Sequence, residues 1–493
     1  MKAKLQVYLL LFISLIAYYI LAYETLRTEV YQVFALFGVL FLAYGLLYKS
    51  VRDASTYKWL LFASILFRVI LLFALPNLSD DFYRFNWDGR LLVNGISPFE
   101  ALPIHFMDGT YLGIVPDNLT NTLYSQLNSP EYFTIYPPVC QFIFWFSCFF
   151  FPNDLYGATV LMKTFLLFFE IGSIYLLYRM VQAFGIAPKK ILLYALNPLV
   201  IVELTGNLHF EAAMIFFTLL AVRFVLPIFS PSKGEISLPD SKGDVMFFEG
   251  NNRNIIFSAI AMGLAVSSKL IPLIFLPFFI SYLGFRKSIL YGGIVGIVTF
   301  LGFLPLFTFD ILQNLLSSVG LYFQKFEFNA SIYYLVRWLG YQQYGYNVIQ
   351  TAGRNLAILT LVSILLLAFW RSRGARSQGR GVKKIHLVET LSLLQNFLFA
   401  LLIYFAFANI VHPWYVNSLV ALCIFTSFRF PILWSGMVVL TYYTYLTDSY
   451  TENLYLVALE YIVVYAYLGW ELAFFGGKKR EVGSKLKQYF VSE

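Results

Sequence analysis

The feature that most constrains this chain is a succession of long apolar runs that begins near the N-terminus and continues to its last quarter. Segments such as 30–48 and 355–370 are almost continuously apolar. A run of about 18 such residues spans a bilayer as a helix, because lipid cannot satisfy backbone polar groups. A transmembrane β-barrel would instead require alternating apolar and polar residues. The chain is 13% charged, whereas soluble proteins carry about 25% charge. We therefore expect an all-α, polytopic transmembrane helical bundle.

The runs predict about fourteen spans, with both termini on the cytoplasmic side. The expected spans are 5–23, 30–48, 59–76, 158–181, 191–204, 210–229, 255–268, 270–283, 288–307, 351–370, 386–408, 414–429, 432–446 and 453–474. The net charge of +8 is concentrated in short loops such as 49–58 and 371–384, as the positive-inside rule requires. Nucleic-acid binding is therefore not expected. We expect residues 1–493 to form one multi-pass domain of a plasma or inner membrane.

Two longer segments fall on the outer side of this topology. The first, 77–153, follows the third span, and its part 77–136 holds seven carboxylates against two arginines. Residues 137–151 are apolar but begin with two prolines, which favours a re-entrant or interfacial helix. The second segment, 308–350, is rich in Tyr, Phe, Asn and Gln, side chains that stack and hydrogen-bond at wet surfaces. We expect these outer segments to form short interfacial helices and to carry the functional site.

The most informative stretch is SDDFYRFNWDGR, residues 79–90, directly beyond the third span. Its candidate site residues are Asp80, Asp81, Arg84, Trp87, Asp88 and Arg90. A carboxylate here can take a proton from a sugar hydroxyl, the guanidiniums can hold a phosphate, and the aromatic rings can stack on a sugar. The same pattern also fits the start of a helix, with a pair between Arg84 and Asp88 one turn apart. The residues alone leave both interpretations open.

This stretch resembles the first outer loop of GT-C-type glycosyltransferases, most closely the polyprenol-phosphate-mannose-dependent mannosyltransferases of bacteria. Three further elements fit in order. TIYPP at 134–138 resembles the family's Tyr-Pro-Pro element, and NPL at 197–199 with GNLHFE at 206–211 resembles its Asn-Pro and Gly-x-x-His-x-acid elements. SKLIPL at 268–273 resembles its Lys-x-x-Pro-Leu element. The similarity covers most of the chain.

The resemblance implies a donor and a mechanism. A polyprenyl-phosphate-linked sugar, mannose by resemblance, would lie at the outer face, and a loop carboxylate would deprotonate the hydroxyl of a lipid or glycan acceptor. That hydroxyl attacks the anomeric carbon in one inverting step, and the lipid phosphate leaves. Carried over by position, Asp80 is the first choice as base and Asp81 the second. The family pattern is often Asp-x-Asp, so a divalent metal at this adjacent pair stays open, and no other cofactor is expected.

Further polar residues lie at the outer ends of expected spans, where ionisable groups are expensive unless they function. The candidates for substrate contact are Tyr136, His209, Glu211, Lys269, Arg337, His412, Trp414 and Tyr415. The alternatives are helix capping, a snorkelling lysine and an interfacial aromatic belt that contacts membrane lipids. Inside or at the edge of spans, we expect Lys163, Glu170 and Glu203 to pair within the membrane.

Two other function classes fit a polytopic protein. A transporter or flippase would place charges at the midplane of Gly/Pro-broken helices in paired halves, whereas this chain gathers its charge in one outer segment. A polymerase or ligase that uses a glycan-diphosphate donor would be expected to have its functional loop late in the chain, whereas the charged loop of this protein lies early in the chain. We therefore favour a lipid-linked glycosyltransferase.

Overall fold

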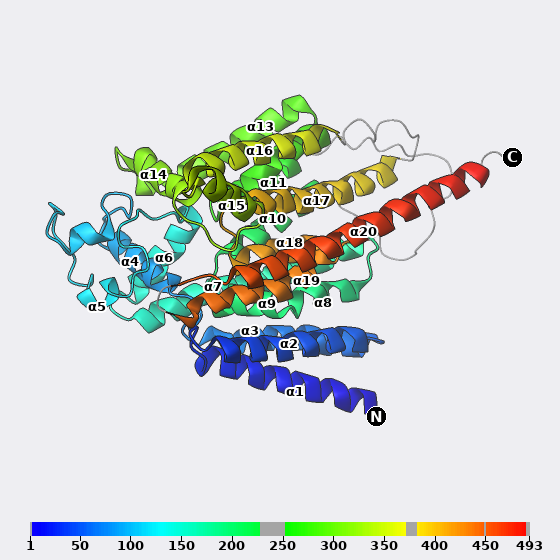
Figure 1. Ribbon diagram of the computed structural model, residues 1–493, viewed down its shortest axis with the longest axis horizontal. Coiled ribbons are helices and arrows are strands. Elements are labelled where there is room, and N and C mark those ends of the chain that lie inside the picture. Colours follow the sequence, from blue (N-terminus) through cyan, green and yellow to red (C-terminus); the bar gives the residue numbers. More distant parts are fainter. Residues whose placement is uncertain (1, 227–251, 371–381, 448–449, 490–493) are drawn as a thin grey trace.

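A computed structural model describes residues 2–226, 252–370, 382–447 and 450–489, and within these ranges every regular element is a helix. The expected all-α, polytopic bundle is confirmed, because long apolar helices run side by side along its length (Figure 1). The basic loop 371–384 lies largely outside the described residues.

Eight helices of the described chain are long and apolar enough to cross a membrane. They are α1 (Lys2–Tyr23), α2 (Val30–Ser50), α3 (Ala54–Leu72), α7 (Leu155–Ala183), α13 (Phe285–Phe303), α16 (Ile349–Trp370), α17 (Val382–Phe407) and α20 (Leu454–Tyr489). Each coincides with one of the expected spans, and their apolar composition is what the span prediction detected.

The other six expected spans form shorter or broken elements. They fall on η2 (Pro188–Ile191) with α8 (Leu192–Ala195), α9 (Pro198–Val200) and η3 (Ile201–Gly206), α10 (Glu211–Val225), α11 (Asn252–Val266), η4 (Ile271–Phe275) with α12 (Leu276–Leu283), η8 (Pro413–Tyr415) with α18 (Val416–Cys423), and α19 (Phe430–Met437) with η9 (Val438–Leu446). In four of these runs a proline at or near the start of a helical piece removes a backbone donor and restarts the helix. The other two, α10 and α11, are continuous helices of 15 residues. By length, the described chain therefore supports eight spans rather than fourteen, or nine if the pair Pro198–Gly206 and Glu211–Val225, bent by 111°, is one broken span.

The two long segments lie together at one end of the bundle. The start of α1 and the end of α20 lie at one end in Figure 1, whereas α4 (Asp81–Val93), α5 (Asn121–Tyr124) and α14 (Ile311–Gln324) lie at the other. This arrangement agrees with a topology that has both termini on one side and both long segments on the opposite side.

Helix α4 is built into this end of the bundle by close packing against α6 (Pro138–Phe150), the 13-residue apolar helix at 138–150. Gly89 makes the approach possible, since a Cβ atom there would lie 2.5 Å from the Phe144 carbonyl oxygen. On its other side, α4 contributes Trp87 and Leu91 to a small apolar core with Phe106 of η1 (Pro103–Phe106). The outer segment is thus a packed unit rather than a loose loop.

Buried charges inside the bundle hold the end of α3, from which the chain enters this outer segment. The fully buried Arg68 and Glu170 form an ion pair of 2.9 Å, so the pairing expected for Glu170 is seen. Lys163 instead donates to the carbonyls of Leu71 and Ala74, at 2.5 and 2.6 Å. Carbonyls at a helix C-terminus lack intrahelical partners, so Lys163 fixes the point at which the chain leaves the bundle.

Candidate active site

The two adjacent acids lie at the N-terminus of α4, where the helix emerges from its buried surroundings. Asp81 is the first residue of α4, and Asp80 precedes it. Both are partly exposed, whereas the next turns of α4 are mostly buried. The positive end of the helix dipole favours carboxylates in these positions. The acids are therefore held in a fixed place with one side open.

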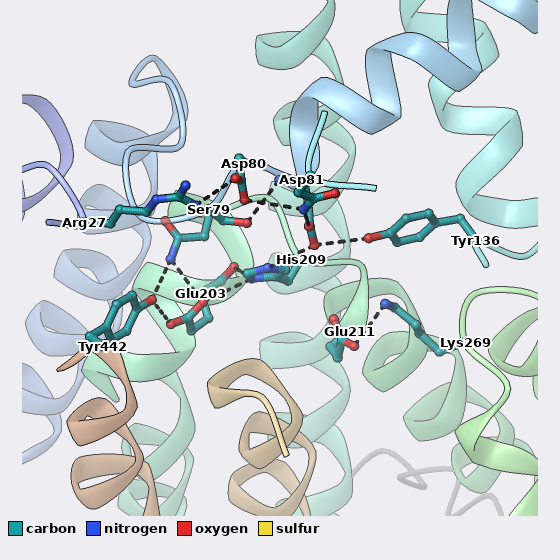
Figure 2. A network of polar contacts seen from close by, with 12 residues as sticks. Arg27, Ser79, Asp80, Asp81, Tyr136, Glu203, His209, Glu211, Lys269 and Tyr442 are labelled. Carbon is teal, nitrogen blue, oxygen red and sulfur yellow. Dashed lines mark hydrogen bonds and ion pairs between the residues drawn. The ribbon is translucent and has the colours of Figure 1, made fainter. Parts of the chain in front are cut away.

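Asp80 is neutralised by a cation that the sequence analysis did not include. Arg27, between α1 and α2, places Nη1 2.9 Å from Asp80 Oδ2 (Figure 2). The same guanidinium donates to the Tyr450 hydroxyl at 2.9 Å and lies 5.1 Å from the ring centroid of Tyr445. Asp80 thus belongs to a charged contact that joins the first and last helices.

Asp81 is instead held by neutral donors. The Tyr136 hydroxyl donates to Oδ2 at 3.1 Å, and the Asn128 amide donates to Oδ1 at 2.9 Å. His209 Nε2 lies 4.0 Å from Oδ2 (Figure 2). The side chain is 21% exposed. No cation lies within ion-pair distance of this carboxylate among the described residues unless His209 is protonated, so Asp81 is the freer of the two bases.

His209 is anchored on its far side by Glu203. Its Nδ1 lies 3.1 Å from Glu203 Oε2, and this carboxylate also accepts hydrogen bonds from Asn207 at 3.0 Å and from the Tyr442 hydroxyl at 2.5 Å. The intramembrane pairing expected for Glu203 is therefore seen, and it connects directly to the site.

Lys269 and Glu211 form a second charged contact beside Asp81. Lys269 Nζ lies 3.4 Å from Glu211 Oε1 and 5.0 Å from the Tyr136 ring centroid. Burial acts to lower the pKa of Lys269, but the carboxylates of Glu211 and Asp81 outweigh it and raise that pKa, so the ammonium stays charged. A fixed cation thus lies close to Asp81 without pairing with it.

A column of stacked rings closes one side of the site. The His209 and Trp414 rings are 3.8 Å apart, and His412 stacks on Trp414 at 4.3 Å. Tyr415 meets His412 edge-on at 5.5 Å. Burial lowers the pKa of His412 to about 3, against the opposing effect of Asp81, so this imidazole is neutral. Trp414 therefore packs between two imidazoles within the site.

The remaining candidates of the 79–90 stretch point into the outer segment. Arg84 pairs with Asp88 at 2.8 Å, one turn apart on α4, and donates to the carbonyls of Ser129 and Tyr132. Trp87 is fully buried, and Arg90 donates to the Asn118 carbonyl at 2.5 Å. Arg84, Trp87, Asp88 and Arg90 thus make contacts within the protein, as the helix interpretation predicts. Substrate contact by these four residues stays a prediction.

Arg337 lies in a different group of contacts. It is on α15 (Ile332–Tyr344), where it pairs with Glu327 and lies over the Tyr334 ring at 4.2 Å. Its role in holding a phosphate stays a prediction. The structure brings Asp80, Asp81, Tyr136, His209, Glu211, Lys269, His412 and Trp414 together, and it adds Arg27, Asn128, Glu203 and Tyr442.

The two acids do not form a ready metal site in this arrangement. No group of three or more His, Cys, Asp or Glu side chains in the described ranges gathers as metal ligands do. The Asn128 amide group, a donor, contacts both Asp80 and Asp81 at 3.5 and 2.9 Å, and Arg27 occupies the free side of Asp80. A divalent cation here stays a prediction, and no step proposed below uses one.

An apolar cavity of about 260 Å³ lies between helices of the bundle, and its lining includes residues close in sequence to Lys269 and His412. It is lined by Leu273, Ile274, Pro277, Gly353, Ala357, Thr360, Leu361, Ile364, Tyr404, Phe407, Ala408 and Asn409. Leu273 follows Lys269 by little more than one helical turn, and Asn409 shortly precedes His412. The small residues Gly353, Ala357 and Ala408 leave space between α12, α16 and α17. The cavity therefore lies among α12, α16 and α17, and none of the charged residues of the site lines it.

The fold and this site define a polytopic membrane protein with a charged, partly open site at one end of its helical bundle. Residues 14–284, more than half of the chain, match the MptA_B family, described as alpha-(1->6)-mannopyranosyltransferase, N-terminal domain, and the chain belongs to this family. The chain is thus a mannosyltransferase, as the resemblance of its motifs implied. Neither the curated proteins nor the solved structures contain a match.

Proposed function

We propose that this mannosyltransferase takes mannose from a polyprenyl-phosphate donor and transfers it, with inversion, to a glycan or lipid acceptor at the outer face of the membrane. One observation carries the proposal: the Asp81 carboxylate, which no fixed cation neutralises among the described residues, lies within electrostatic reach of the charged Lys269, and an apolar cavity of the same bundle is lined by residues that follow Lys269 in sequence. A base, a phosphate-binding charge and a channel for a lipid tail are the parts that such a donor requires.

Asp81 is the general base of the proposed reaction, with Asp80 as its neighbour. A base must be free to gain a proton, and the carboxylate of Asp80 is paired with Arg27 at 2.9 Å. Asp81 accepts only neutral hydrogen bonds and lies toward His209 and Tyr136. These contacts favour Asp81 over Asp80 as the base, the opposite of the order that the motif alone suggested.

Lys269 supports the departure of the lipid phosphate. As the acceptor oxygen bonds to the anomeric carbon, the bond from that carbon to the phosphate oxygen breaks, and negative charge grows on the phosphate. A preorganised cation stabilises such charge as it develops. Glu211 holds the Lys269 ammonium in place and keeps it protonated. Arg27, on the other side of the acid pair, is positioned to add a second donor.

The stereochemistry of the donor follows from the proposed step. The family description specifies an α-(1→6) product, and a single displacement inverts the configuration at the anomeric carbon. An α-linked product therefore requires a β-linked mannosyl phosphate. Transfer from the α-anomer of the donor by the purified protein would exclude the single inverting step.

The apolar cavity suits the polyprenyl tail. Its lining on α16 runs from Gly353 to Ile364, which at 1.5 Å per residue corresponds to about 16 Å along the helix. The walls are aliphatic and aromatic, with Asn409 at the end nearest His412. A phosphate near Lys269 would therefore have its lipid chain directed into this space.

Transfer assays with purified protein, synthetic polyprenyl-phosphate mannose and a pool of glycan and lipid acceptors test the proposal. Asp81→Asn keeps the size of the side chain and removes the base, so we expect kcat to fall about 10²–10⁴-fold. Asp80→Asn is the matched control. We expect it to lower kcat less than Asp81→Asn does, and also to weaken binding of the donor. The base assignment fails if Asp80→Asn abolishes transfer while Asp81→Asn retains it. Absence of transfer from any polyprenyl-phosphate mannose by the wild type would remove the proposed donor.

A further inference from the structure

His209 is a buried residue of the site, and one of its two ring nitrogens has no hydrogen-bond partner. Its Nε2 has no hydrogen-bond partner and lies 4.0 Å from Asp81 Oδ2, and its Nδ1 lies 3.1 Å from Glu203 Oε2. Because an ionised carboxylate can only accept hydrogen bonds, the proton of a neutral ring belongs on Nδ1. The Nε2 lone pair is then directed toward Asp81.

Two irregularities of the backbone produce this geometry. Glu203 lies in η3, a π-helix over Ile201–Gly206, and Leu208 adopts a φ of 63°. π-Helical turns are rare and frequent at functional sites, and a left-handed non-glycine residue costs of order 1–3 kcal/mol. Together they turn the chain by 111° before α10. Glu203 and His209 consequently face each other across the bend.

The ring and its carboxylate are both immobilised. Asn207 and Tyr442 donate to the two oxygens of Glu203, at 3.0 and 2.5 Å. The imidazole stacks on Trp414 at 3.8 Å and is 2% exposed. The titratable and charged groups around it are Asp81 from α4, Glu203 from η3, His412 beside η8, and Lys269 with its partner Glu211. The carboxylates of Glu203 and Asp81 are the nearest of these groups to the ring nitrogens.

We infer that His209 is a positioning residue that receives the proton collected by Asp81, an inference that rests on the proposed transfer reaction. The acceptor oxygen bonds to the anomeric carbon, the carbon–oxygen bond to the lipid phosphate breaks, and its electron pair leaves with the phosphate. The acceptor proton passes to the Asp81 carboxylate and then to His209 Nε2. Glu203 stabilises the imidazolium that results.

The 4.0 Å separation is about 1 Å longer than a hydrogen bond. Catalytic hydrogen bonds are commonly long before substrate binds and shorten in the complex. Asp81, the first residue of α4, is separated from His209 by this gap, whereas Tyr136 and Asn128 already contact its carboxylate. A small rotation of the Asp81 side chain therefore completes the chain of contacts from acceptor to Glu203.

Chemical rescue separates proton acceptance from a purely structural role. We expect His209→Ala to lower kcat about 100-fold with an unchanged KM for polyprenyl-phosphate mannose. Added imidazole should restore kcat, more strongly as pH rises through the pKa of free imidazole. Thiazole, a ring of the same shape that is far less basic, should not. His105→Ala, in η1 and outside the site, is the matched control and should behave as wild type.

The outcomes distinguish this inference from the proposed function. Wild-type kcat in His209→Ala, or equal rescue by thiazole and imidazole, would overturn the proton-accepting role. If the alanine variant fails to fold, Glu203→Gln supplies the test: we expect a lower kcat with a shifted pH profile, and an unchanged kcat and profile would overturn the inference. A wild type that transfers no mannose from the polyprenyl donor refutes the proposed function instead.

Discussion

At the scale of single residues, this protein combines buried charges that only hold the fold with a few that face an open site. Arg68 with Glu170, and Arg84 with Asp88, are buried pairs whose opposite charges meet within the protein. Asp81 and Lys269 differ, because each lies near opposite or polar partners without complete neutralisation. Incomplete pairing is therefore the property on which we base the proposed roles of Asp81 and Lys269.

His412 gives a residue-scale prediction about pH. Its folded pKa of about 3 lies below the value of about 6.5 for an exposed imidazole, and burial is the main cause. The unfolded chain then binds more protons between these values, so the stability associated with His412 is lost as pH falls from about 6.5 toward 3. Thermal unfolding in detergent at several pH values should show a shallower decline below pH 6.5 for His412→Gln than for wild type. Identical slopes would contradict the assignment.

At the scale of elements, apolar content identified the long helices but not the interruptions in the others. Segments 191–204 and 432–446 are as apolar as continuous spans, yet they fold into short helical pieces with prolines at or near their starts. A local pattern also placed Asp80 and Asp81 at the start of a helix. It could not reveal Arg27, Asn128 or Tyr442, since their contacts join positions far apart in the chain.

The close packing of α4 against α6 leads to a prediction about protein stability. A Cβ atom at Gly89 would lie 2.5 Å from the Phe144 carbonyl and 2.6 Å from Cys148 Sγ. Gly89→Ala should therefore destabilise the protein by about 1–3 kcal/mol and lower transfer by shifting Asp81. Gly38→Ala in α2 is the control, because a Cβ atom there meets nothing within 4 Å. Equal melting temperatures for the two variants would show that α4 tolerates displacement.

At the scale of the whole molecule, both long segments lie at one end of the bundle, and the second of them, 308–350, contacts the loop after α17 and the loop before α20. Asn329 shows the connection, since its amide donates to the Val411 carbonyl and its backbone N–H donates to Glu452. This end of the structure is therefore assembled from segments that lie far apart in the chain.

The apolar cavity supplies a prediction at this scale. Ala357→Phe should fill part of the space between α12, α16 and α17. Loss of about two buried CH₂ groups of lipid corresponds to about 1.6 kcal/mol, so we expect KM for a long-chain polyprenyl-phosphate mannose to rise about tenfold. A short-chain donor should be unaffected. Ile358→Phe, on the exposed side of α16, is the control. A similar rise for both donors would locate the tail elsewhere.

The contact from Arg27 to Asp80 and Tyr450 has a consequence for how the enzyme is made. Tyr442 and Tyr450 leave the ribosome last, whereas the acids they help to hold leave it early. A half-synthesised chain already inserted in the membrane would therefore carry the aspartates but not their complete surroundings. Under the proposed function, sugar transfer therefore begins only after translation has delivered η9 and the loop before α20.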